Sequence, residues 1–337
     1  MMRLPWFDYR APRSVAEASK ILAGEGPAAM LIAGGTDLLP NMKRRHQTPK
    51  VLVSLKGIEE LKKISNGSGL NLGSGLTLAE VVHGKNIKEK YTALYQAAAQ
   101  VATVHLRNMG TLGGNLCLDT RCTYYNQNHE WRKAIDFCLK KDGDICWVAT
   151  ASKRCVAVSS TDTAPAMIAL DAKVRLEGPS GGREIPVETL YKNDGIDYLS
   201  RTPDEILTAV TIPGGWKSTY WKLRRRGAFD FPVLGVAVAL KFSGKVIEDA
   251  RIALGAAASR PFLVAKASDF LKGRTLSDEV IAEVSTLVAN RAKPMDNTDM
   301  DLYWRKEVAD DFAGYALREL RGDDMREIRL RIARHAL

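Results

Sequence analysis

The sequence predicts an α+β fold that is built from several units. Its 337 residues, of which 45% are hydrophobic, can bury a large core and are typical of two or three domains. Short apolar strands alternate with amphipathic helices up to about residue 213, and the pattern then changes to two long strands followed by two helices. We therefore expect units at residues 1–57, 58–215 and 216–337.

The unit at residues 1–57 is expected to contain one helix and two strands. Ser14 is a favourable N-cap for the segment SVAEASKILAGEG, whose apolar residues recur at helical spacing. AAMLIAGG then predicts a buried strand that runs into a glycine turn, and KVLVSL predicts a second strand. This order is typical of a small α/β unit.

The unit at residues 58–215 is expected to mix helices and strands. In LNLGSGLTLAEV a short strand precedes a helix that starts at Thr77, and Glu80 three residues later completes a capping-box pattern. TALYQAAAQVAT predicts another helix, and a short helix is expected near HEWRKAIDFC within a loop-like stretch. TAPAMIALDAKVRLEG predicts a helix and a strand, and EILTAVTIP predicts a strand that ends at Pro213.

The unit at residues 216–337 begins after the break at Pro213 to Trp216. FPVLGVAVALKFSGKVIEDARIALGAA predicts a hairpin of two long strands around the turn SGK. Two amphipathic helices are expected to close the chain, in SDEVIAEVSTLVANRA and DLYWRKEVADDFAGYALREL.

Composition and charge narrow the classes of function. No apolar run approaches the roughly 18 residues that a membrane span needs, and the N-terminal MMRLPWFDYRAPRS lacks the apolar core of a signal peptide. We therefore expect a cytoplasmic protein without a membrane partner. The net charge of +10 allows an acidic partner, but the basic clusters are short and none is interleaved with aromatic residues. Nucleic acid is accordingly not an expected partner.

Two glycine-rich segments are candidates for ligand loops. They are LIAGGTDLLP at residues 31–40 and HLRNMGTLGGN at residues 105–115. Gly34 and Gly35 lack a Cβ, so backbone N–H groups can come close to an anion such as a pyrophosphate. Either segment alone is compatible with a simple turn, whereas two in one chain favour a dinucleotide of unspecified kind.

All five cysteines lie within residues 117–155, which indicates a metal site. An odd number of thiols and the expected cytoplasmic location argue against disulfides. There is no CxxC pair, so the spacing fits neither a zinc ribbon nor a bacterial ferredoxin motif. Zinc and an iron–sulfur cluster remain equally compatible with the residues, unligated thiols are a third reading, and His105 or His129 are possible but unneeded ligands.

Two further segments carry polar residues that have either a purely structural role or a role in ligand binding. In SSTDTAPAMIALDA, Asp162 and its neighbours either only cap an apolar helix or also accept hydrogen bonds from ligand hydroxyls. In YWKLRRRGAFDFP, Lys222 and Arg226 either pair with a phosphate or a flavin or are solvated strand ends.

The order of the motifs is more specific than any one of them. FDYRAPRSVAEA, LIAGGTDLLP, GSGLTLAEV, VHLRNMGTLGGNL, SSTDTAPAMIALDA, RRRGAFDFPVLGVAVAL and ARIALGAAASRP follow one another in the chain. In this order they resemble the FAD-binding medium subunit of the molybdenum hydroxylases, the family of xanthine dehydrogenase and carbon monoxide dehydrogenase. The resemblance spans nearly the whole chain. It implies a two-part, PCMH-like FAD-binding domain followed by an α+β domain like the C-terminal domain of the CO dehydrogenase flavoprotein.

The resemblance also implies which residues bind FAD. Residues 31–38 would hold the pyrophosphate, the second glycine-rich segment would form another FAD loop, Asp162 would meet the ribityl chain or ring, and Lys222 would lie near the isoalloxazine. The implied set is Leu31, Ile32, Ala33, Gly34, Gly35, Thr36, Asp37, Leu38, Val101, Asn108, Gly110, Thr111, Leu112, Gly113, Gly114, Asn115, Asp162 and Lys222.

One departure from the family concerns the cysteines. In ordinary members the GGNL segment leads within a few residues to the Ser/Asp helix start, but here residues 119–158 intervene and carry four thiols. This insert resembles the β subunit of 4-hydroxybenzoyl-CoA reductase, a branch of the family with an extra [4Fe–4S] cluster. The resemblance implies that the metal ligands are Cys122, Cys138, Cys146 and Cys155, whereas Cys117 precedes the insert and is left out.

The implied function is electron transfer and not bond-breaking on the substrate, so no catalytic residue is expected in this chain. The molybdenum cofactor would lie in a large partner subunit and [2Fe–2S] clusters in a small one, in a dimer of heterotrimers. Ferredoxin would be the electron donor, and the complex would reduce 4-hydroxybenzoyl-CoA to benzoyl-CoA in the degradation of aromatic compounds. Two alternatives stay open: the flavin subunit of another molybdenum hydroxylase, and a zinc-stapled scaffold subunit without catalytic function.

Overall fold

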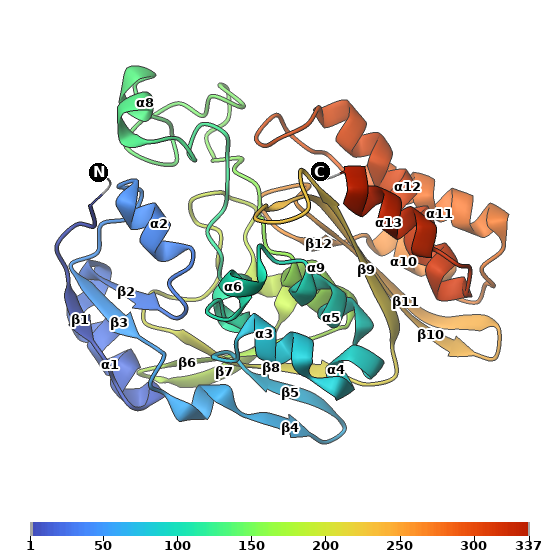
Figure 1. Ribbon diagram of the computed structural model, residues 1–337, viewed down its shortest axis with the longest axis horizontal. Helices are drawn as coiled ribbons and strands as arrows, with labels where there is room; N and C mark the ends of the chain where they lie inside the picture. Colours follow the sequence, from blue (N-terminus) through green and yellow to red (C-terminus); the bar gives the residue numbers. More distant parts are fainter. Residues whose placement is uncertain (1–2, 336–337) are drawn as a thin grey trace.

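Three β-sheets and the helices around them make up the computed structural model, which describes residues 3–335 (Figure 1). The α+β class expected from the sequence is confirmed by this mixture of sheets and helices. The outermost residues of the first and last expected units, 1–2 and 336–337, lie outside the described residues. None of the helices described is both long and apolar enough to cross a membrane.

The first sheet has three parallel strands in the order β1-β3-β2. The strands are β1 (Asp8–Arg10), β3 (Val51–Ser54) and β2 (Ala29–Ile32), and the helices of this part are α1 (Val15–Glu25) and α2 (Leu38–Lys43). Parallel strands of one sheet need a crossover connection, and α1 lies in the one that leads from β1 to β2, on the far side of β3. The predicted cap of α1 is confirmed, because the Ser14 side chain accepts a hydrogen bond from the Glu17 N–H at 3.1 Å.

The second sheet has five antiparallel strands in the order β4-β5-β8-β6-β7. Its strands are β4 (Ile64–Asn66), β5 (Gly69–Gly73), β8 (Ile206–Pro213), β6 (Lys173–Gly178) and β7 (Gly181–Pro186). The helices of this part are α3 (Leu78–His83), α4 (Lys85–Lys90), α5 (Thr92–Ala99), α6 (Val104–Arg107), α7 (Leu112–Leu116) and α9 (Thr163–Ala169). The capping box of Thr77 and Glu80 at the start of α3 is present as predicted.

The third sheet has four antiparallel strands in the order β12-β11-β10-β9. Its strands are β9 (Lys217–Arg224), β10 (Pro232–Ser243), β11 (Val246–Gly255) and β12 (Phe262–Leu263). The predicted hairpin is formed by β10 and β11, and Gly244 makes the turn with a positive φ of 62°. Along β10 the side chains of Ala237 and Ala239 belong to the core around α9, whereas Val236 and Val238 belong to the core under the C-terminal helices.

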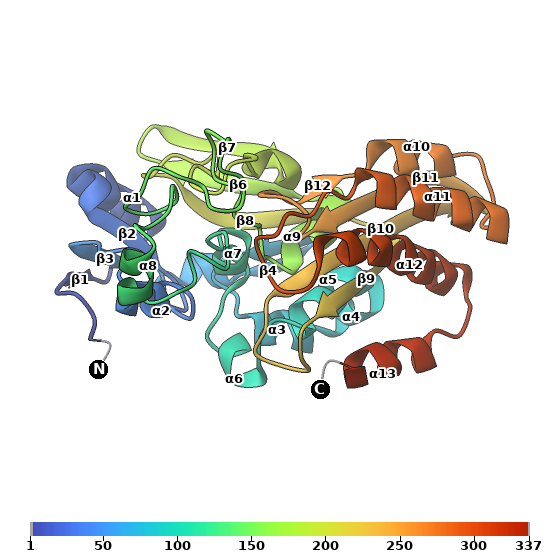
Figure 2. The same cartoon turned by 90° about the horizontal axis from the view of Figure 1, so that it is seen from above.

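Four helices cover the outer face of the third sheet (Figure 2). They are α10 (Ala265–Leu271), α11 (Asp278–Arg291), α12 (Leu302–Arg321) and α13 (Arg326–His335). The sequence predicts only α11 and α12. The short α10 and the terminal α13 are additional, and α13 follows a sharp chain reversal at Gly322, whose φ is 117°.

The insert, residues 119–158, forms a loop with one short helix, α8 (His129–Ala134), beside α2 (Figures 1 and 2). Its two ends are joined by a bridge between Arg121 and Val158. Asn297, which precedes α12, fixes the insert to the third part of the fold: its carbonyl accepts from the Thr123 N–H at 2.9 Å, and its side chain donates to the Val156 carbonyl at 2.6 Å.

Candidate functional site

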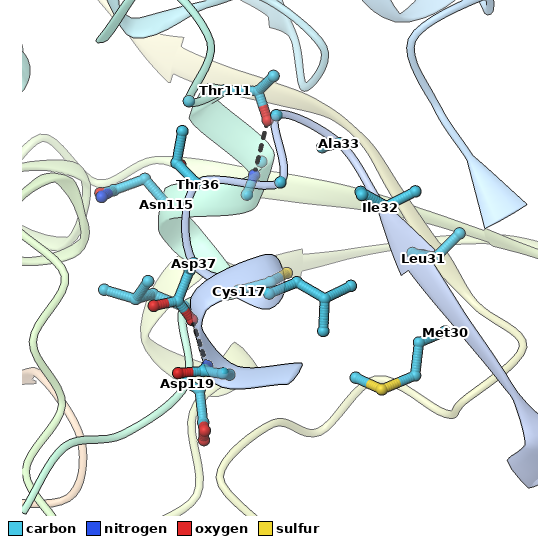
Figure 3. A pocket seen from close by; sticks show the side chains of 18 of the residues that line it. Met30, Leu31, Ile32, Ala33, Thr36, Asp37, Thr111, Asn115, Cys117 and Asp119 are labelled. Atoms are coloured by element: carbon cyan, nitrogen blue, oxygen red, sulfur yellow. Dashed lines mark hydrogen bonds between the residues drawn. The ribbon is translucent and has the colours of Figure 1, made fainter. Parts of the chain in front are cut away.

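One cavity of about 710 Å³ lies among the three parts of the fold, and we call it the main cavity. This volume is in the range of pockets that hold small molecules and cofactors. Its wall includes β2, the segment after β5, and the segment between β9 and β10. Figure 3 shows the turn after β2, with Thr36 and Asp37, opposite Thr111 and Asn115.

The two glycine segments touch each other backbone to backbone on this wall. A Cβ atom on Gly34 would lie 1.9 Å from the Met109 carbonyl oxygen and 2.9 Å from the Gly110 nitrogen, so only glycine fits at this position. Gly35 has a φ of 71°, a left-handed conformation that a side chain would strain. The approach leaves backbone groups of both segments on the cavity wall.

The second glycine segment is held by hydrogen bonds of its own residues. The Thr111 hydroxyl accepts from the Gly114 N–H at 3.0 Å. Asn115 Oδ1 accepts from the hydroxyl groups of Thr161, at 2.9 Å, and Thr163, at 2.6 Å. Asn115 therefore joins the second glycine segment to the start of α9.

The structure places most of the residues implied as FAD ligands on the wall of the main cavity. These are Leu31, Ile32, Ala33, Gly34, Gly35, Thr36, Asp37, Leu38, Val101, Gly110, Thr111, Gly113, Gly114, Asn115 and Asp162.

Three of the implied FAD ligands, Asn108, Leu112 and Lys222, do not line this wall, and their contact with FAD stays a prediction. Asn108 follows α6 and is exposed, because the chain turns outward there. Leu112 is fully buried in the core. Lys222 has no exposed side-chain surface and lies behind Asp162 and Asp230, which both line the cavity.

Lys222 forms a buried charge cluster with these two carboxylates. Its ammonium lies 3.1 Å from Asp162 Oδ1 and 3.7 Å from Asp230 Oδ1, and it donates to the Gln100 carbonyl at 3.0 Å. Burial raises the pKa of Asp162, and the nearby Lys222 opposes this shift. The predicted cap of α9 is made by Thr161, whose hydroxyl accepts from the Ala164 N–H, whereas the Asp162 side chain makes no capping hydrogen bond.

Several polar and aromatic residues of the main cavity were not among the candidate site residues of the sequence. They are Asn41, Arg44, Gln47, Asp119, Arg121, Tyr198, Arg201, Phe229, Asp230 and Phe231. The last three had a usable signal, because they lie in the segment YWKLRRRGAFDFP, and so had Asn41, which directly follows the first glycine segment and lies one helical turn after Asp37. The others reach the cavity only through tertiary contacts.

The four insert cysteines Cys122, Cys138, Cys146 and Cys155 line one small second cavity, which we call the cysteine cavity. All four side chains are buried. Burial raises the pKa of the Cys122 thiol to about 11 and that of Cys155 to about 12, although backbone N–H groups oppose both shifts. One of these groups is the Ala157 N–H, which donates to Cys155 Sγ at 3.4 Å.

The side chains around the thiols do not form a site for a single metal ion. Within the part of the chain that the structure describes, no three His, Cys, Asp or Glu side chains lie close enough to hold one ion. Cys117 lies apart from the other thiols, on the wall of the main cavity, and burial raises its pKa.

The two cavities are joined by a buried polar bridge. Asp119 lines the main cavity, whereas Tyr125 and Lys140 line the cysteine cavity. The Tyr125 hydroxyl donates to Asp119 Oδ2 at 2.9 Å, and the Lys140 ammonium donates to Asp119 Oδ1 at 2.8 Å. The carboxylate of Asp119 therefore connects the walls of the two cavities by hydrogen bonds.

Comparison with known families shows the family of the chain. Residues 5–215 match the FAD binding domain in molybdopterin dehydrogenase, and residues 218–320 match the CO dehydrogenase flavoprotein C-terminal domain. The chain belongs to this FAD-binding family. The main cavity, with its two touching glycine segments, is thus the candidate FAD site of a molybdenum hydroxylase flavoprotein.

Individual relatives agree with the family over nearly the whole chain. The aldehyde oxidoreductase FAD-binding subunit PaoB of Escherichia coli K12 is 31% identical over 90% of this chain and 96% of the relative. The carbon monoxide dehydrogenase medium chain of Hydrogenophaga pseudoflava is 25% identical over 93% of this chain and 96% of the relative.

Solved structures show the same fold. A carbon monoxide dehydrogenase structure from Hydrogenophaga pseudoflava superposes with a TM-score of 0.77 at 25% identity, covering 94% of this chain and 97% of that one. Quinoline 2-oxidoreductase from Pseudomonas putida 86 superposes with a TM-score of 0.73 at 25% identity, covering 99% of each chain. The fold of these flavoprotein chains therefore extends over nearly the whole chain.

Proposed function

We propose that this chain is the electron-transfer subunit of a molybdenum enzyme complex of the 4-hydroxybenzoyl-CoA reductase type, and that it carries FAD and a [4Fe–4S] cluster. The observation that carries the proposal is the convergence of four insert cysteines on one cavity beside the FAD cavity. The family match supports the flavin. The cluster and the substrate rest on the insert.

The residues of the main cavity fit FAD. Backbone groups of residues 31–38 and of Gly110 to Gly114 would hold the pyrophosphate, because glycine at Gly34 lets both segments approach the anion. Asp162 would accept from hydroxyls of the flavin chain. Lys222 would act on the flavin only through the carboxylates of Asp162 and Asp230 that cover it. Bound there, flavin supplies the chemistry of accepting two electrons together and releasing them singly.

The residues of the cysteine cavity fit a [4Fe–4S] cluster better than zinc. In such a cluster each thiolate binds a different iron, so the four sulfurs are further apart than the ligands of a single tetrahedral ion. The thiols converge on one cavity, and no single-ion site is found among the residues that the structure describes, which agrees with this wider spacing. A Cβ on Gly195 would lie 2.6 Å from Cys155 Sγ, so only glycine leaves room for this thiol.

The partners are proposed from the relatives, several of which are named medium chains of carbon monoxide or glyceraldehyde dehydrogenases. We expect a large subunit with the molybdenum cofactor and a small subunit with [2Fe–2S] clusters, assembled as a dimer of heterotrimers. We also propose that the chain itself has three units, at residues 1–57, 58–215 and 216–337, and that the insert is part of the second.

The electron donor is proposed to be a ferredoxin. Ile145 and Trp147, which flank Cys146, are 45% and 36% exposed, so the cluster loop reaches the surface beside one ligand. A one-electron donor can dock there and reduce a nearby cluster without entering the main cavity. Two electrons and two protons would then convert 4-hydroxybenzoyl-CoA to benzoyl-CoA and water on the molybdenum subunit.

A second candidate function is favoured by the relative with 31% identity, whose name states that it belongs to an aldehyde oxidoreductase. In that case the electrons would leave an aldehyde at the molybdenum centre and pass outward through the same cofactors. The cavities of this chain are compatible with either direction of electron flow.

The test is to purify the complex with its partner subunits anaerobically and to assay both reactions. With reduced ferredoxin, or a viologen as its substitute, the proposal predicts loss of 4-hydroxybenzoyl-CoA and formation of benzoyl-CoA in equal amounts. Oxidation of aromatic or aliphatic aldehydes without dehydroxylation would support the second candidate and contradict the first.

A further inference from the structure

Arg121 belongs to the insert and also lines the main cavity. The next residue, Cys122, lines the cysteine cavity. The backbone N–H of Arg121 donates to the Val158 carbonyl at 2.8 Å, and the Val158 N–H donates back at 2.7 Å. The position of Arg121 is thus tied to both ends of the insert.

The side chain of Arg121 holds the first glycine segment. It is only 5% exposed, Nη1 donates to Asn41 Oδ1 at 2.9 Å, and Nη2 forms an ion pair with Asp37. Asn41 in turn donates to Asp37 Oδ2 at 3.1 Å, which closes a network of three side chains. Asp37 lies two residues after Gly35, so this network fixes the end of the segment that would hold the FAD pyrophosphate.

The guanidinium is enclosed by protein groups. Arg121 Nε is buried and has no hydrogen-bond partner among the residues that the structure describes. The guanidinium lies 5.0 Å from the ring of Phe231, another residue of the main cavity. Because a buried charged donor without a partner is costly, the contacts with Asp37 and Asn41 are what hold the guanidinium in this position.

We propose that Arg121 is a positioning residue that couples FAD binding to binding of the iron–sulfur cluster. Ligation of Cys122 by the cluster fixes the backbone of its neighbour, Arg121, and thereby the guanidinium that holds Asp37 beside the pyrophosphate. Each cofactor then strengthens the binding of the other by the same factor, as thermodynamic linkage requires. This inference rests on the cluster of the proposed function.

The test measures FAD affinity in the full-length chain with and without the cluster. The cluster is removed anaerobically with an iron chelator, the FAD is removed, and FAD is titrated back while its fluorescence is followed. We expect FAD to bind about ten-fold more tightly to the cluster-loaded wild type, within the usual range of coupling between sites. In Arg121→Gln this ratio should fall below about three-fold, because the contact with Asp37 and Asn41 is lost.

Two further variants separate coupling from general damage. Arg121→Lys keeps the charge but cannot contact Asp37 and Asn41 together as the guanidinium does. The ratio of FAD affinities with and without the cluster should therefore also fall. Arg326→Gln removes an arginine whose side chain is 87% exposed and paired with Asp324, far in the sequence from both cavities, so its affinity ratio should equal that of the wild type. Reciprocity gives a second readout: bound FAD should slow the release of iron to the chelator in the wild type but not in Arg121→Gln.

The outcomes distinguish the two proposals. The coupling is overturned if the wild type binds FAD equally well with and without the cluster, or if both Arg121 variants keep the wild-type ratio of affinities. Neither result contradicts the proposed cluster. A chain that binds FAD but never holds iron and sulfide overturns the proposed cluster, and the coupling with it.

Discussion

The ammonium of Lys222 lies 3.1 Å from Asp162 Oδ1, in a part of the third sheet where the lysine side chain has no exposed surface. Asp230 is the second carboxylate of this cluster, and it also pairs with Arg224 at 2.6 Å. A buried cation between two carboxylates is stable only as a set, because removal of one partner leaves charge without compensation. The cluster forms the part of the FAD cavity wall that α9 and the β9–β10 segment share.

Substitution of Lys222 therefore tests the stability of this wall. Lys222→Met should lower the free energy of unfolding by about 3–5 kcal/mol and weaken FAD binding, because buried Asp162 loses its cation, whereas Asp230 keeps Arg224. Urea unfolding and FAD titration measure the two effects. Lys272→Met, which removes an exposed lysine near Asp269, should change the free energy of unfolding by no more than about 0.5 kcal/mol. Equal effects of the two substitutions would refute a special role for Lys222.

Gly34→Ala tests the contact between the two glycine segments. The new Cβ would meet the Met109 carbonyl at 1.9 Å, so the segments must separate and the FAD site must widen. We expect FAD affinity to fall at least ten-fold, with the loss measured by fluorescence titration. Gly24→Ala is the matched control, because nothing lies within 4 Å of its added Cβ and the residue is in helix α1. Wild-type affinity in Gly34→Ala would contradict the predicted close approach.

Cysteine substitutions separate the proposed ligands from the fifth thiol. Cys155→Ser should abolish the stable binding of iron and sulfide, whereas Cys117→Ser should keep both, because Cys117 lines the other cavity. Iron and acid-labile sulfide per FAD are the quantities to measure. Loss of iron in Cys117→Ser, with iron retained in Cys155→Ser, would reverse the assignment.

His46, in the segment that follows α2, predicts an acid-sensitive contact with the insert. Its ring stacks on Tyr125 at 4.1 Å, and burial lowers its pKa from 6.5 to about 4, with Arg132 adding to the shift. The unfolded chain therefore binds the proton more readily than the folded one between these values. The stability that comes from neutral His46 is complete above pH 6.5 and is lost as the pH falls toward 4, by up to about 3 kcal/mol.

His46→Phe keeps the stacking and removes the proton site. In the chain without its cluster, the fall in melting temperature between pH 7 and pH 5 should be smaller in this variant than in the wild type. His83→Asn, a change of an exposed histidine in α3, should leave the fall unchanged. The same pH dependence in His46→Phe and the wild type would assign the effect to other groups.

Local sequence patterns were sufficient for much of the fold. The caps at Ser14 and Thr77 and the hairpin around Gly244 depend on residues that are neighbours in the chain, so their signals are readable in the sequence. The glycine segments were also visible, because positions such as Gly34 and Gly35 need a residue without a Cβ.

Residues whose role depends on distant parts of the chain were not predictable. Arg121 has no motif, and its meaning comes from Asp37 and Phe231, which approach it only in the folded protein. Lys222 is predicted to lie near the isoalloxazine, and the sequence alone could not show that its side chain points inward from β9, where Asp162 and Asp230 lie beside its ammonium. The sequence shows where charges lie in the chain and not which carboxylates they meet.

The most direct test of the central claim is the cofactor content of the anaerobically purified chain, with its absorption spectrum. We predict about one FAD with about four irons and four acid-labile sulfides per chain, and a broad iron–sulfur absorption beneath the flavin bands. FAD accompanied by zinc, or by no metal, would contradict the cluster at Cys122, Cys138, Cys146 and Cys155 and leave a flavin subunit of another molybdenum hydroxylase.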